Sequence, residues 1–469
     1  MAMRLRLFGQ FVHASIAALA AVEAAAFVGT LYLAYRIRFG TWYPTAPESA
    51  RDVLWPCAAV FSGAVVVSLL AFGLYSSRQR ARIAGLSVRL IAATAAAAVV
   101  TAAAFYLVPS LWIGRGVLGL AALLALGTTL VSRVLFARIA NERFFKRRVL
   151  VYGVGQRTTA MSRLRRRSDR RGFEIVGFLQ PGGEDVCVPA ARVLGSEAEL
   201  LELCDRYEVH EIVMAMEDRR RGFPLRELLE CRIAGIEVTE LLTFLERETG
   251  RVHIDVLNPS WMIFGEGFRR DPLRLLSARL LDLLASLLTV VVSLPVMVVT
   301  ALAIKLEDGW RAPVFYRQAR VGLAGHSFDV LKFRSMRTDA ERDGQAQWAQ
   351  KADPRVTRVG AVIRKLRIDE LPQILNVLRG HMSFVGPRPE RPQFANELVG
   401  KIPYYVLRHC VKPGITGWAQ LCYPYGSSEE DAFEKLQYDL YYIKNNSLLF
   451  DLAILVQTAE VVFMGKGAR

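Results

Sequence analysis

The chain has 469 residues, of which 52% are hydrophobic, and it carries a formal net charge of +16. A soluble enzyme is rarely both so apolar and so basic, whereas an integral membrane protein that works beside anionic lipid headgroups combines both properties. The basic residues flank apolar runs rather than forming one long stripe, and no nucleic-acid-binding module is recognisable. Composition therefore ranks membrane and phosphate partners well ahead of nucleic acid.

Four long apolar runs occupy the first part of the chain, at Phe11–Tyr35, Val53–Tyr75, Leu90–Val108 and Val117–Phe136. Each is near the ~20 residues that a membrane-spanning helix needs. The first run is too long for a cleaved signal peptide and lacks a clear small-residue cleavage site. The sequence therefore predicts a four-helix transmembrane bundle over residues 1–141.

The distribution of arginines predicts the orientation of this bundle. Basic residues precede the first run, surround the link between the second and third runs, and follow the fourth, while the other two links are nearly neutral. The positive-inside rule then places both ends of the bundle in the cytoplasm. Only Glu23 and His13 are ionisable in the first run, and none is found deep in the other three. Glu23 is interpreted either as functional or as packed against a neighbouring helix.

Residues 142–258 alternate strand-like and helix-like patterns, which predicts a soluble α/β domain with a parallel sheet. Strands are expected at Val149–Tyr152, Glu174–Phe178, Glu211–Met216 and Gly235–Glu240, with helices after the turn at Gly153–Gly155 through Arg166, at Glu197–Tyr207 and at Leu225–Ala234. The turn reads G-x-G-x-x-T, with Thr158 where a dinucleotide-binding fingerprint has its third glycine. The pattern favours a degenerate Rossmann-like domain with a structural or regulatory role and no bound NAD. A retained phosphate-ligand site is the less favoured alternative.

Six cysteines are spread along the chain, at Cys57, Cys187, Cys204, Cys231, Cys410 and Cys422. None forms a C-x-x-C pair or a zinc-site spacing. Reduced, buried thiols are the favoured interpretation, and they imply that the soluble parts of the chain face the cytoplasm.

Leu280–Leu306 is a fifth apolar run, long enough by hydropathy to span a membrane. Pro295 lies near its middle, two residues after Ser293. A proline removes one helix hydrogen bond and bends the helix, and a nearby serine hydroxyl can partly satisfy the freed carbonyl. The prediction is a broken, re-entrant membrane helix over residues 273–306, and the alternative is an ordinary kinked spanning helix.

Beyond Lys305 the chain is polar and basic. Strands are expected at Pro313–Tyr316 and Phe328–Arg334, an exposed loop with a short helix at Thr338–Asp353, and two final helices at Phe433–Asn445 and Leu448–Phe463. The last helix is apolar with few charges. It is expected either to lie at the membrane interface or to close the core.

The segment Arg364–Glu390 sets an acidic pair, Asp369 and Glu370, between basic clusters. Pro372–Leu378 predicts a short helix with Gly380 just past its end, which places both carboxylates at the helix N-terminus. Carboxylates, arginines and a helix N-terminus together suit phosphoryl transfer. Because neighbouring residues on a helix point in different directions, the two acids are assigned different roles.

This segment, with Lys332–Met336 before it and Lys412–Gln420 after it, closely resembles the monotopic polyprenyl-phosphate phosphoglycosyl transferases of bacteria. The resemblance covers roughly residue 273 to the C-terminus and includes several separated motifs in the family's order. The four apolar runs and the α/β domain ahead of it resemble the large, exopolysaccharide-type form of this family. The resemblance therefore implies a multi-domain membrane protein whose residues 259–469 form an α/β catalytic domain with a re-entrant helix.

The resemblance implies that a UDP-sugar and undecaprenyl phosphate give undecaprenyl-diphosphate-sugar and UMP in the presence of Mg²⁺. It implies that Asp369 is a nucleophile that forms an acyl phosphate, which the lipid phosphate attacks in the second half of a ping-pong cycle. Asp369 and Glu370 are the implied metal ligands. The implied phosphate- and substrate-binding residues are Lys332, Arg334, Arg364 and Arg388, because arginine forks suit phosphate oxygens.

The same resemblance matches Pro295 with the family's helix-breaking proline, although Leu294 separates it from Ser293 here. A complete crossing would place Asp369 outside the cell, whereas an enzyme that uses nucleotide-activated substrates needs it inside. The implied location is thus the bacterial inner membrane, with the catalytic domain on the cytoplasmic face and the lipid bilayer as a partner. The implied role is exopolysaccharide or surface glycan biosynthesis, and the size of the accessory parts allows a homodimer.

Two alternatives come from other classes of protein. A membrane-anchored NAD-dependent nucleotide-sugar dehydratase needs an intact glycine fingerprint and a Tyr-x-x-x-Lys pair, and none of the 15 tyrosines has a lysine four residues later. A non-catalytic scaffold or regulator of polysaccharide export predicts that replacing Asp369 leaves function intact. No recognisable stretch encodes which sugar is transferred.

Overall fold

The computed structural model contains two compact units, Met1–Leu257 and Asn258–Arg469. The residues described are 4–7, 10–42, 51–72, 74–75, 83–111, 113–139, 146–162, 164, 172–182, 184–194, 199–218, 222–257, 271–337, 355–423, 426 and 428–463. The predicted loop at Thr338–Asp353 lies outside them.

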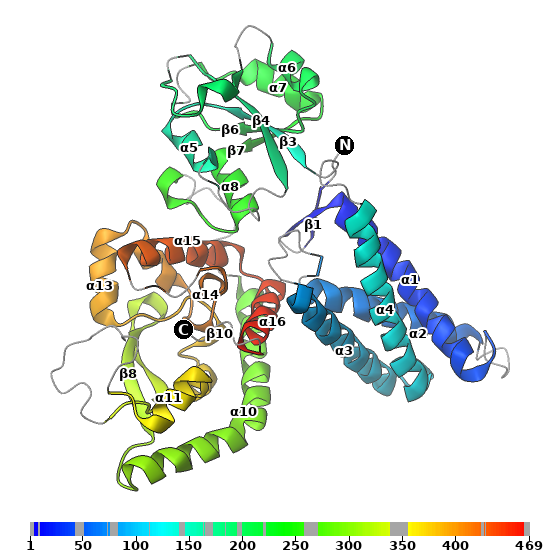
Figure 1. Cartoon of the computed structure of the whole chain (residues 1–469), viewed down its shortest axis with the longest axis vertical. Coiled ribbons are helices and arrows are strands. Elements are labelled where there is room, and N and C mark those ends of the chain that lie inside the picture. The colour runs from blue at the N-terminus through cyan, green and yellow to red at the C-terminus, as the bar shows by residue number, and fades with distance from the viewer. Residues whose placement is uncertain are drawn as a thin grey trace. The chain divides into compact units, whose positions relative to one another are not determined.

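Four apolar helices occupy the first part of unit 1, as predicted (Figure 1). They are α1 (Ala14–Phe39), α2 (Arg51–Ala71), α3 (Ile83–Leu107) and α4 (Arg115–Ile139), with the short 3-10 turn η2 (Pro109–Leu111) before α4. In length and composition α1, α3 and α4 suffice to cross a membrane, and α2 offers a shorter apolar stretch, Leu54–Leu70. Phe27, Phe61 and Leu69 are fully buried between the helices.

The start of the first run differs from the prediction. Phe11 to His13 belong to a strand, β2 (Gln10–His13), which pairs antiparallel with β1 (Arg4–Leu7). The apolar composition of this stretch suits a strand as well as a helix, and pairing with a second strand decides between them.

A polar cluster inside the bundle accounts for Glu23. Buried Glu23 accepts hydrogen bonds from the hydroxyls of Tyr75 and Ser132, each at 2.5 Å, and pairs with Arg133 at 3.4 Å. Arg133 lies near the end of the fourth run, three residues before Phe136. A buried carboxylate is stable only when it is paired, so Glu23 packs against a neighbouring helix, the second of its two interpretations.

A five-stranded parallel sheet forms the rest of unit 1 and confirms the predicted α/β domain. Its spatial order is β5 (Val193–Leu194), β4 (Phe173–Leu179), β3 (Arg147–Tyr152), β6 (Glu211–Met214) and β7 (Glu237–Glu240). The first strand along the chain lies at the centre, which is the doubly wound order.

The helices of this domain are α5 (Gln156–Ser162), α6 (Leu200–Arg206), α7 (Leu225–Ile233) and α8 (Leu241–Thr249), with 3-10 turns η3 (Ala190–Arg192) and η4 (Ile254–Val256). The helix expected to reach Arg166 ends earlier, because Leu164 is not helical. The short strand β5 and the helix α8 were not expected.

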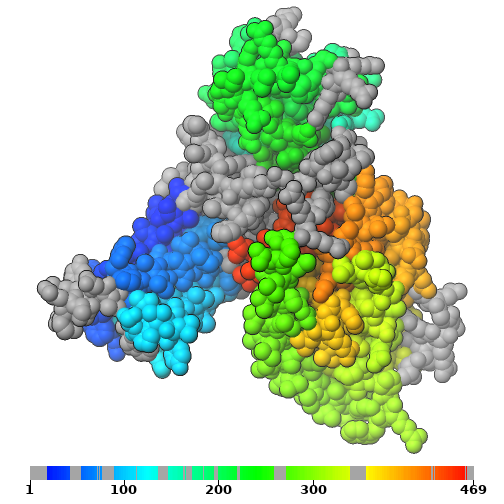
Figure 2. Space-filling view, turned by 180° about the vertical axis from the view of Figure 1, so that it is seen from behind, coloured from blue at the N-terminus to red at the C-terminus, as the bar shows by residue number. Residues whose placement is uncertain are grey.

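Unit 2 begins with the long helix α10 (Pro272–Asp308), which Asp271 caps by accepting a hydrogen bond from the Leu273 N–H at 3.0 Å. Figure 1 shows that α10 bends sharply part of the way along, and Pro295 lies inside it. By length and composition α10 could cross a membrane. It lies on the surface of unit 2 (Figure 2, green), with large apolar side chains such as Leu284 and Val292 exposed.

The expected role of Ser293 is wrong. Its hydroxyl lies 3.6 Å from the sulfur of Met297 rather than against a freed carbonyl. The carbonyl that Pro295 leaves unpaired belongs to Val291. A serine on a helix reaches only carbonyls three or four residues before it, and Val291 is two residues before Ser293.

The polar part of unit 2 starts with an antiparallel hairpin of β8 (Phe315–Val321) and β9 (Ser327–Phe333), joined through η5 (Leu323–Gly325). The first of these strands begins and ends later than the predicted Pro313–Tyr316. Phe333 packs with Ile304 of α10 and Ile363, while Val330 packs with Val377 and Met382. The hairpin thus rests on two small apolar clusters.

The remaining elements complete unit 2. They are α11 (Arg358–Lys365), η6 (Ile368–Glu370), α12 (Gln373–Arg379), α13 (Pro392–Lys401), η7 (Tyr405–Cys410), α14 (Trp418–Cys422), α15 (Glu429–Asn445), α16 (Leu448–Phe463) and a parallel pair, β10 (Ser383–Val385) and β11 (Gly414–Thr416). Helix α16 has its predicted bounds. Its buried Asp451 accepts hydrogen bonds from Arg274 at 2.5 Å and from the Tyr442 hydroxyl at 2.9 Å, so α16 closes the core.

Candidate active site

A buried amide joins helix α12 to the hairpin. The Asn376 side chain donates to the Asp329 carbonyl at 2.7 Å and accepts from the Leu331 N–H at 2.9 Å. It thereby satisfies backbone groups on the edge of β9 that another strand would otherwise pair. Because Lys332 follows Leu331 on this strand, the contact fixes α12, and the turn before it, beside Lys332.

The far end of α12 is held by the long helix α10. The Arg279 guanidinium donates to the carbonyls of Val377 and Leu378 at 2.6 and 2.7 Å. A cation at these last carbonyls also complements the negative end of the helix dipole. Both ends of α12 are therefore fixed by side chains from other elements.

The two carboxylates lie on their own 3-10 turn, η6, rather than in the first turn of α12. The turn follows Arg367, whose φ of 59° is left-handed. Leu371 and Pro372 separate the carboxylates from the helix. The predicted helix is present, but the acidic pair lies one turn ahead of it.

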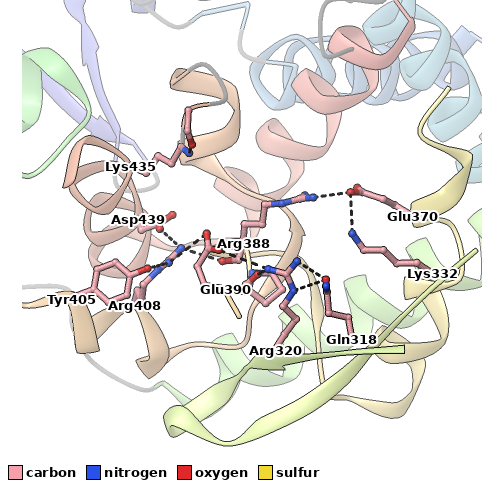
Figure 3. A network of polar contacts seen from close by, with 12 residues as sticks. Gln318, Arg320, Lys332, Glu370, Arg388, Glu390, Tyr405, Arg408, Lys435 and Asp439 are labelled. Carbon is pink, nitrogen blue, oxygen red and sulfur yellow. Dashed lines mark hydrogen bonds and ion pairs between the residues drawn. The ribbon is translucent and has the colours of Figure 1, made fainter. Parts of the chain in front are cut away.

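Glu370 is surrounded by cations (Figure 3). Its Oε1 accepts from Arg388 Nη2 at 2.6 Å and lies 3.8 Å from Lys332 Nζ and 3.7 Å from Arg367 Nη1. Burial alone raises the pKa of Glu370, but the charges of Arg388 and Lys332 outweigh it and lower the pKa to about 2. Glu370 is therefore an anion throughout the physiological pH range.

Asp369 has the opposite electrostatic character. Burial raises the pKa of Asp369 and the charge of Glu370 raises it further, against the opposing charges of Lys332, Arg367 and Arg364. Its Oδ1 atom is buried and accepts no hydrogen bond from the residues that the structure describes. A buried carboxylate oxygen without a partner is rare and is available to a ligand.

The structure gathers three of the four predicted basic residues around this pair. Lys332 and Arg388 pair with Glu370, and the charge of Arg364 acts on Asp369. Arg334 instead pairs with Asp308 at the end of α10, at 2.7 Å, and is buried there. This ion pair connects the end of β9 to the end of α10. Among the described residues, no contact of Arg334 with Asp369 or Glu370 is found.

Glycines bring the loop that carries Arg388 against the segment after η7. A Cβ atom at Gly386 would lie 2.4 Å from the Lys412 carbonyl oxygen, and one at Gly414 would lie 2.1 Å from the Gly386 nitrogen. Such approaches are possible only without a side chain. This close approach of two backbone segments, which helps to place Arg388, was not predicted from the sequence.

The sequence analysis also missed Asn376 and Arg279. Asn376 stands between Leu375 and Val377, and a polar residue at an apolar, buried position of a short helix is the signal that could have found it. Arg279 gave no such signal, because an arginine near the start of a membrane helix is ordinary.

The residues present fit a magnesium ion. No group of three or more metal-ligating side chains occurs within the described ranges. Mg²⁺, however, is often held by one or two carboxylates, together with water and the phosphates of a substrate. Asp369 Oδ1 accepts no hydrogen bond from the described residues, and Glu370 beside it is ionised, so the two carboxylates can serve as such ligands.

Comparisons with known proteins extend these observations. The family model described as bacterial sugar transferase matches residues 273–465, and one described as CoA-binding domain matches residues 70–222. The UDP-glucose:undecaprenyl-phosphate glucose-1-phosphate transferase of Xanthomonas campestris pv. campestris is 30% identical over 99% of this chain and 96% of its own length. Its alignment includes both the apolar helices and the region of the acidic pair.

Two further relatives are similar over shorter stretches. The UDP-N-acetylgalactosamine-undecaprenyl-phosphate N-acetylgalactosaminephosphotransferase of Aeromonas hydrophila is 44% identical over 52% of this chain and 56% of its own length. The exopolysaccharide production protein PSS of Rhizobium leguminosarum bv. phaseoli is 41% identical over 40% of this chain and 96% of its own length.

Four apolar helices, a parallel α/β domain and a sugar transferase region define a membrane protein of the transferase class. The chain belongs to the bacterial sugar transferase family, among its polyprenyl-phosphate phosphoglycosyl transferases.

The second matched family is described as a CoA-binding domain, and the turn after β3 is where dinucleotide-binding domains hold pyrophosphate, but the residues at this turn do not fit such a ligand. The N–H of Val154 donates to Glu184 at 3.1 Å, and the N–H of Gln156 donates to Glu217 at 2.5 Å. A Cβ atom at Gly155 would lie 2.4 Å from Glu217 Oε1. The protein's own carboxylates thus occupy the N–H groups that bind pyrophosphate in dinucleotide-binding domains.

Proposed function

We propose that this protein transfers a sugar 1-phosphate from a UDP-sugar to undecaprenyl phosphate, releasing UMP and forming undecaprenyl-diphosphate-sugar. The observation that carries the proposal is the buried Oδ1 of Asp369, which has no hydrogen-bond partner among the described residues and lies in the field of several cations, within the region matched by the sugar transferase family. Relatives named for this transfer act on UDP-glucose or UDP-N-acetylgalactosamine.

In this proposal the reaction has two displacements at one phosphorus atom. A carboxylate oxygen of Asp369 attacks the sugar-bearing phosphorus of the UDP-sugar, the bond to UMP breaks, and an aspartyl-phosphosugar forms. An oxygen of undecaprenyl phosphate then attacks the same phosphorus and the Asp369 carboxylate leaves. Splitting one displacement between two anions into two steps is the advantage of covalent catalysis.

The raised pKa of Asp369 supports its role as nucleophile, since a more basic carboxylate is the better nucleophile. Glu370 holds Arg388 and Lys332 in place through its ion pairs, and the positive charges of these side chains and of Arg364 suit binding of diphosphate oxygens. Mg²⁺, when bound by Asp369 and Glu370, would neutralise phosphate charge. The nucleophile and the other phosphate-binding groups in this proposal are side chains of the protein.

The proposal includes a re-entrant course for α10, with the catalytic unit on the cytoplasmic face of the bacterial inner membrane. Two features support it: the bend visible in Figure 1 and Pro295 inside the helix. Exposed apolar side chains along α10 suit contact with lipid. Such a helix would bring Asp369 near the membrane surface, where the phosphate of the lipid substrate lies. A homodimer stays a prediction, which mass photometry of solubilised protein tests.

The test of the proposed function is UMP release by the purified protein in nanodiscs, with undecaprenyl phosphate, Mg²⁺ and a panel of UDP-sugars. Asp369→Asn is expected to lower the rate by at least about a thousandfold, or about 4 kcal/mol of activation free energy. Asp329→Asn, an exposed change on β9, is the matched control and should keep the wild-type rate. Equal rates in Asp369→Asn and wild type would refute the nucleophile.

A second arm tests the covalent intermediate. Without undecaprenyl phosphate, a UDP-sugar labelled in the sugar should transfer label to the wild-type protein and not to Asp369→Asn. Release of UMP without any protein-bound label would contradict the two-step course. Absence of UMP release from every donor would favour a non-catalytic scaffold.

A further inference from the structure

We propose that Arg408 is a positioning residue that fixes the loop Pro387-Arg388-Pro389 and so directs Arg388 toward Glu370. This inference rests on the proposed function, in which Arg388 belongs to the phosphate-binding group. Arg408 itself has no contact with either carboxylate among the described residues. It acts through the backbone of Arg388.

The first observation is the contact between the two arginines. Arg408 Nη2 donates to the carbonyl oxygen of Arg388 at 3.1 Å, while the Arg388 side chain extends the other way to Glu370 at 2.6 Å (Figure 3). Arg320 Nη1 donates to the next carbonyl, that of Pro389, at 3.0 Å. Two guanidinium groups therefore hold consecutive carbonyls of one short loop.

The composition of the loop explains why side chains must hold it. Pro387 and Pro389 have no backbone N–H, so they cannot donate to a neighbouring strand. The other side of the loop is held by backbone groups: the Gly414 N–H donates to the Pro387 carbonyl and the Gly386 N–H to the Thr416 carbonyl, both at 2.9 Å. The arginines supply the second side, and together these contacts set the direction of the Arg388 side chain.

Arg408 is itself firmly held. Only 7% of it is exposed, and it donates to Asp439 at 2.9 Å and to the Tyr405 hydroxyl at 2.5 Å. Asp439 lies on α15 and is also buried. A buried ion pair adds little stability compared with apolar residues of the same size. A contribution to stability is therefore a weak explanation for the presence of the Arg408–Asp439 pair. A more specific explanation is that the pair connects the Arg388 loop to α15.

The experiment is a double-mutant cycle on UMP release. The variant Arg408→Gln/Asp439→Asn removes both charges of the buried pair together, and Glu390, which lies 4.0 Å from Arg408, keeps its ion pair with Arg320. It is measured alone and combined with Arg388→Ala, with the thermal midpoint recorded for each protein. Lys401→Gln is the matched control, because Lys401 forms its ion pairs with Glu397 and Glu429 at the surface.

If Arg408 acts through Arg388, the paired variant should lower kcat by about ten- to a hundredfold in the wild-type background. In the Arg388→Ala background the further loss should shrink to less than about threefold, because the group being positioned is already gone. Lys401→Gln should keep the wild-type rate. Equal fold-losses in both backgrounds would overturn the proposal.

A second measurement does not depend on turnover. Amide hydrogen exchange at Gly386 and Gly414 should be faster in the paired variant than in wild type, since the loop loses one of the two guanidinium groups that hold it. Unchanged exchange at both glycines would overturn the inference. Failure of the wild-type protein to release UMP from any UDP-sugar would refute the proposed function instead, and exchange would still decide whether Arg408 holds the loop.

Discussion

Asp369 and Glu370 are neighbours in sequence, but their surroundings shift their pKa values in opposite directions. Glu370 directs Oε1 at Arg388, Lys332 and Arg367, which lowers its pKa to about 2 in spite of burial. Burial and the adjacent Glu370 charge raise the pKa of Asp369. Two carboxylates with separated pKa values suit two roles, one as a permanent anion and one as the more basic, reactive group.

Lys332 leads to a prediction about pH. Burial lowers the pKa of Lys332 to about 8, and the attraction of Glu370 only partly opposes this. A lysine is charged below its pKa, so its charge is lost, and UMP release should fall, as pH rises through about 8. Because arginine keeps its charge, Lys332→Arg should move this alkaline decline to higher pH by more than about one unit.

The control for this pH profile is Lys401→Arg, which changes an exposed lysine in the same unit and should leave the decline in place. An unchanged alkaline decline in Lys332→Arg would show that another group titrates. The measurement is the initial rate of UMP release between pH 6 and pH 10.

At the scale of single elements, the prediction is that Asn376 holds α12 to β9. Asn376→Asp keeps the shape of the side chain but places an acceptor against the Asp329 carbonyl and buries a charge. The change should lower stability by about 3 kcal/mol. Differential scanning fluorimetry should show this as a lower thermal midpoint, and UMP release should fall because the turn of Asp369 is no longer fixed beside Lys332.

Asn396→Asp, the same substitution on the exposed side of α13, is the matched control and should change stability by less than about 0.5 kcal/mol. Equal midpoints for the two variants would contradict the role given to Asn376.

The turn between β3 and α5 leads to a prediction about ligands. Because Glu184 and Glu217 occupy the N–H groups of Val154 and Gln156, the protein should show no saturable binding of CoA or NAD⁺ up to about 1 mM in isothermal titration calorimetry. A dehydrogenase with an intact fingerprint serves as the positive control. Saturable binding that Gly155→Ala abolishes would show that this turn does hold a ligand.

At the scale of the whole molecule, two exposed cysteines can test the course of α10. Cys187 lies in the α/β domain and Cys410 in the catalytic unit, and the remaining four cysteines are buried. If α10 is re-entrant, a membrane-impermeant maleimide should label both thiols in inside-out vesicles and neither in intact spheroplasts. A spanning helix would place the two on opposite faces.

The variants Cys187→Ser and Cys410→Ser assign the signal to each site in this labelling experiment. Labelling of Cys410 in spheroplasts, with Cys187 protected, would contradict the re-entrant course. Pro295→Leu is then expected to favour the spanning course, because it restores the helix hydrogen bond that the proline removes.

The sequence by itself predicted the apolar helices, the parallel α/β domain, the bounds of α16 and the residue types of the candidate site. These features depend on local periodicity and composition, which each segment carries alone. Other features could not be read from the sequence: Phe11–His13 form a strand, Ser293 contacts a sulfur, Arg334 pairs with Asp308, and Arg133 pairs with Glu23. Each depends on a partner or a geometry that residue spacing does not specify.

The tertiary structure alone decided how the site is assembled. Asn376 bonds a strand about 45 residues away in the chain, and Arg408 holds the loop of Arg388 from the far side. The opposite pKa shifts of Asp369 and Glu370 arise from which cations surround each oxygen. Sequence sets which side chains are available, whereas burial, distance and charge, which only folding brings together, determine what those side chains do.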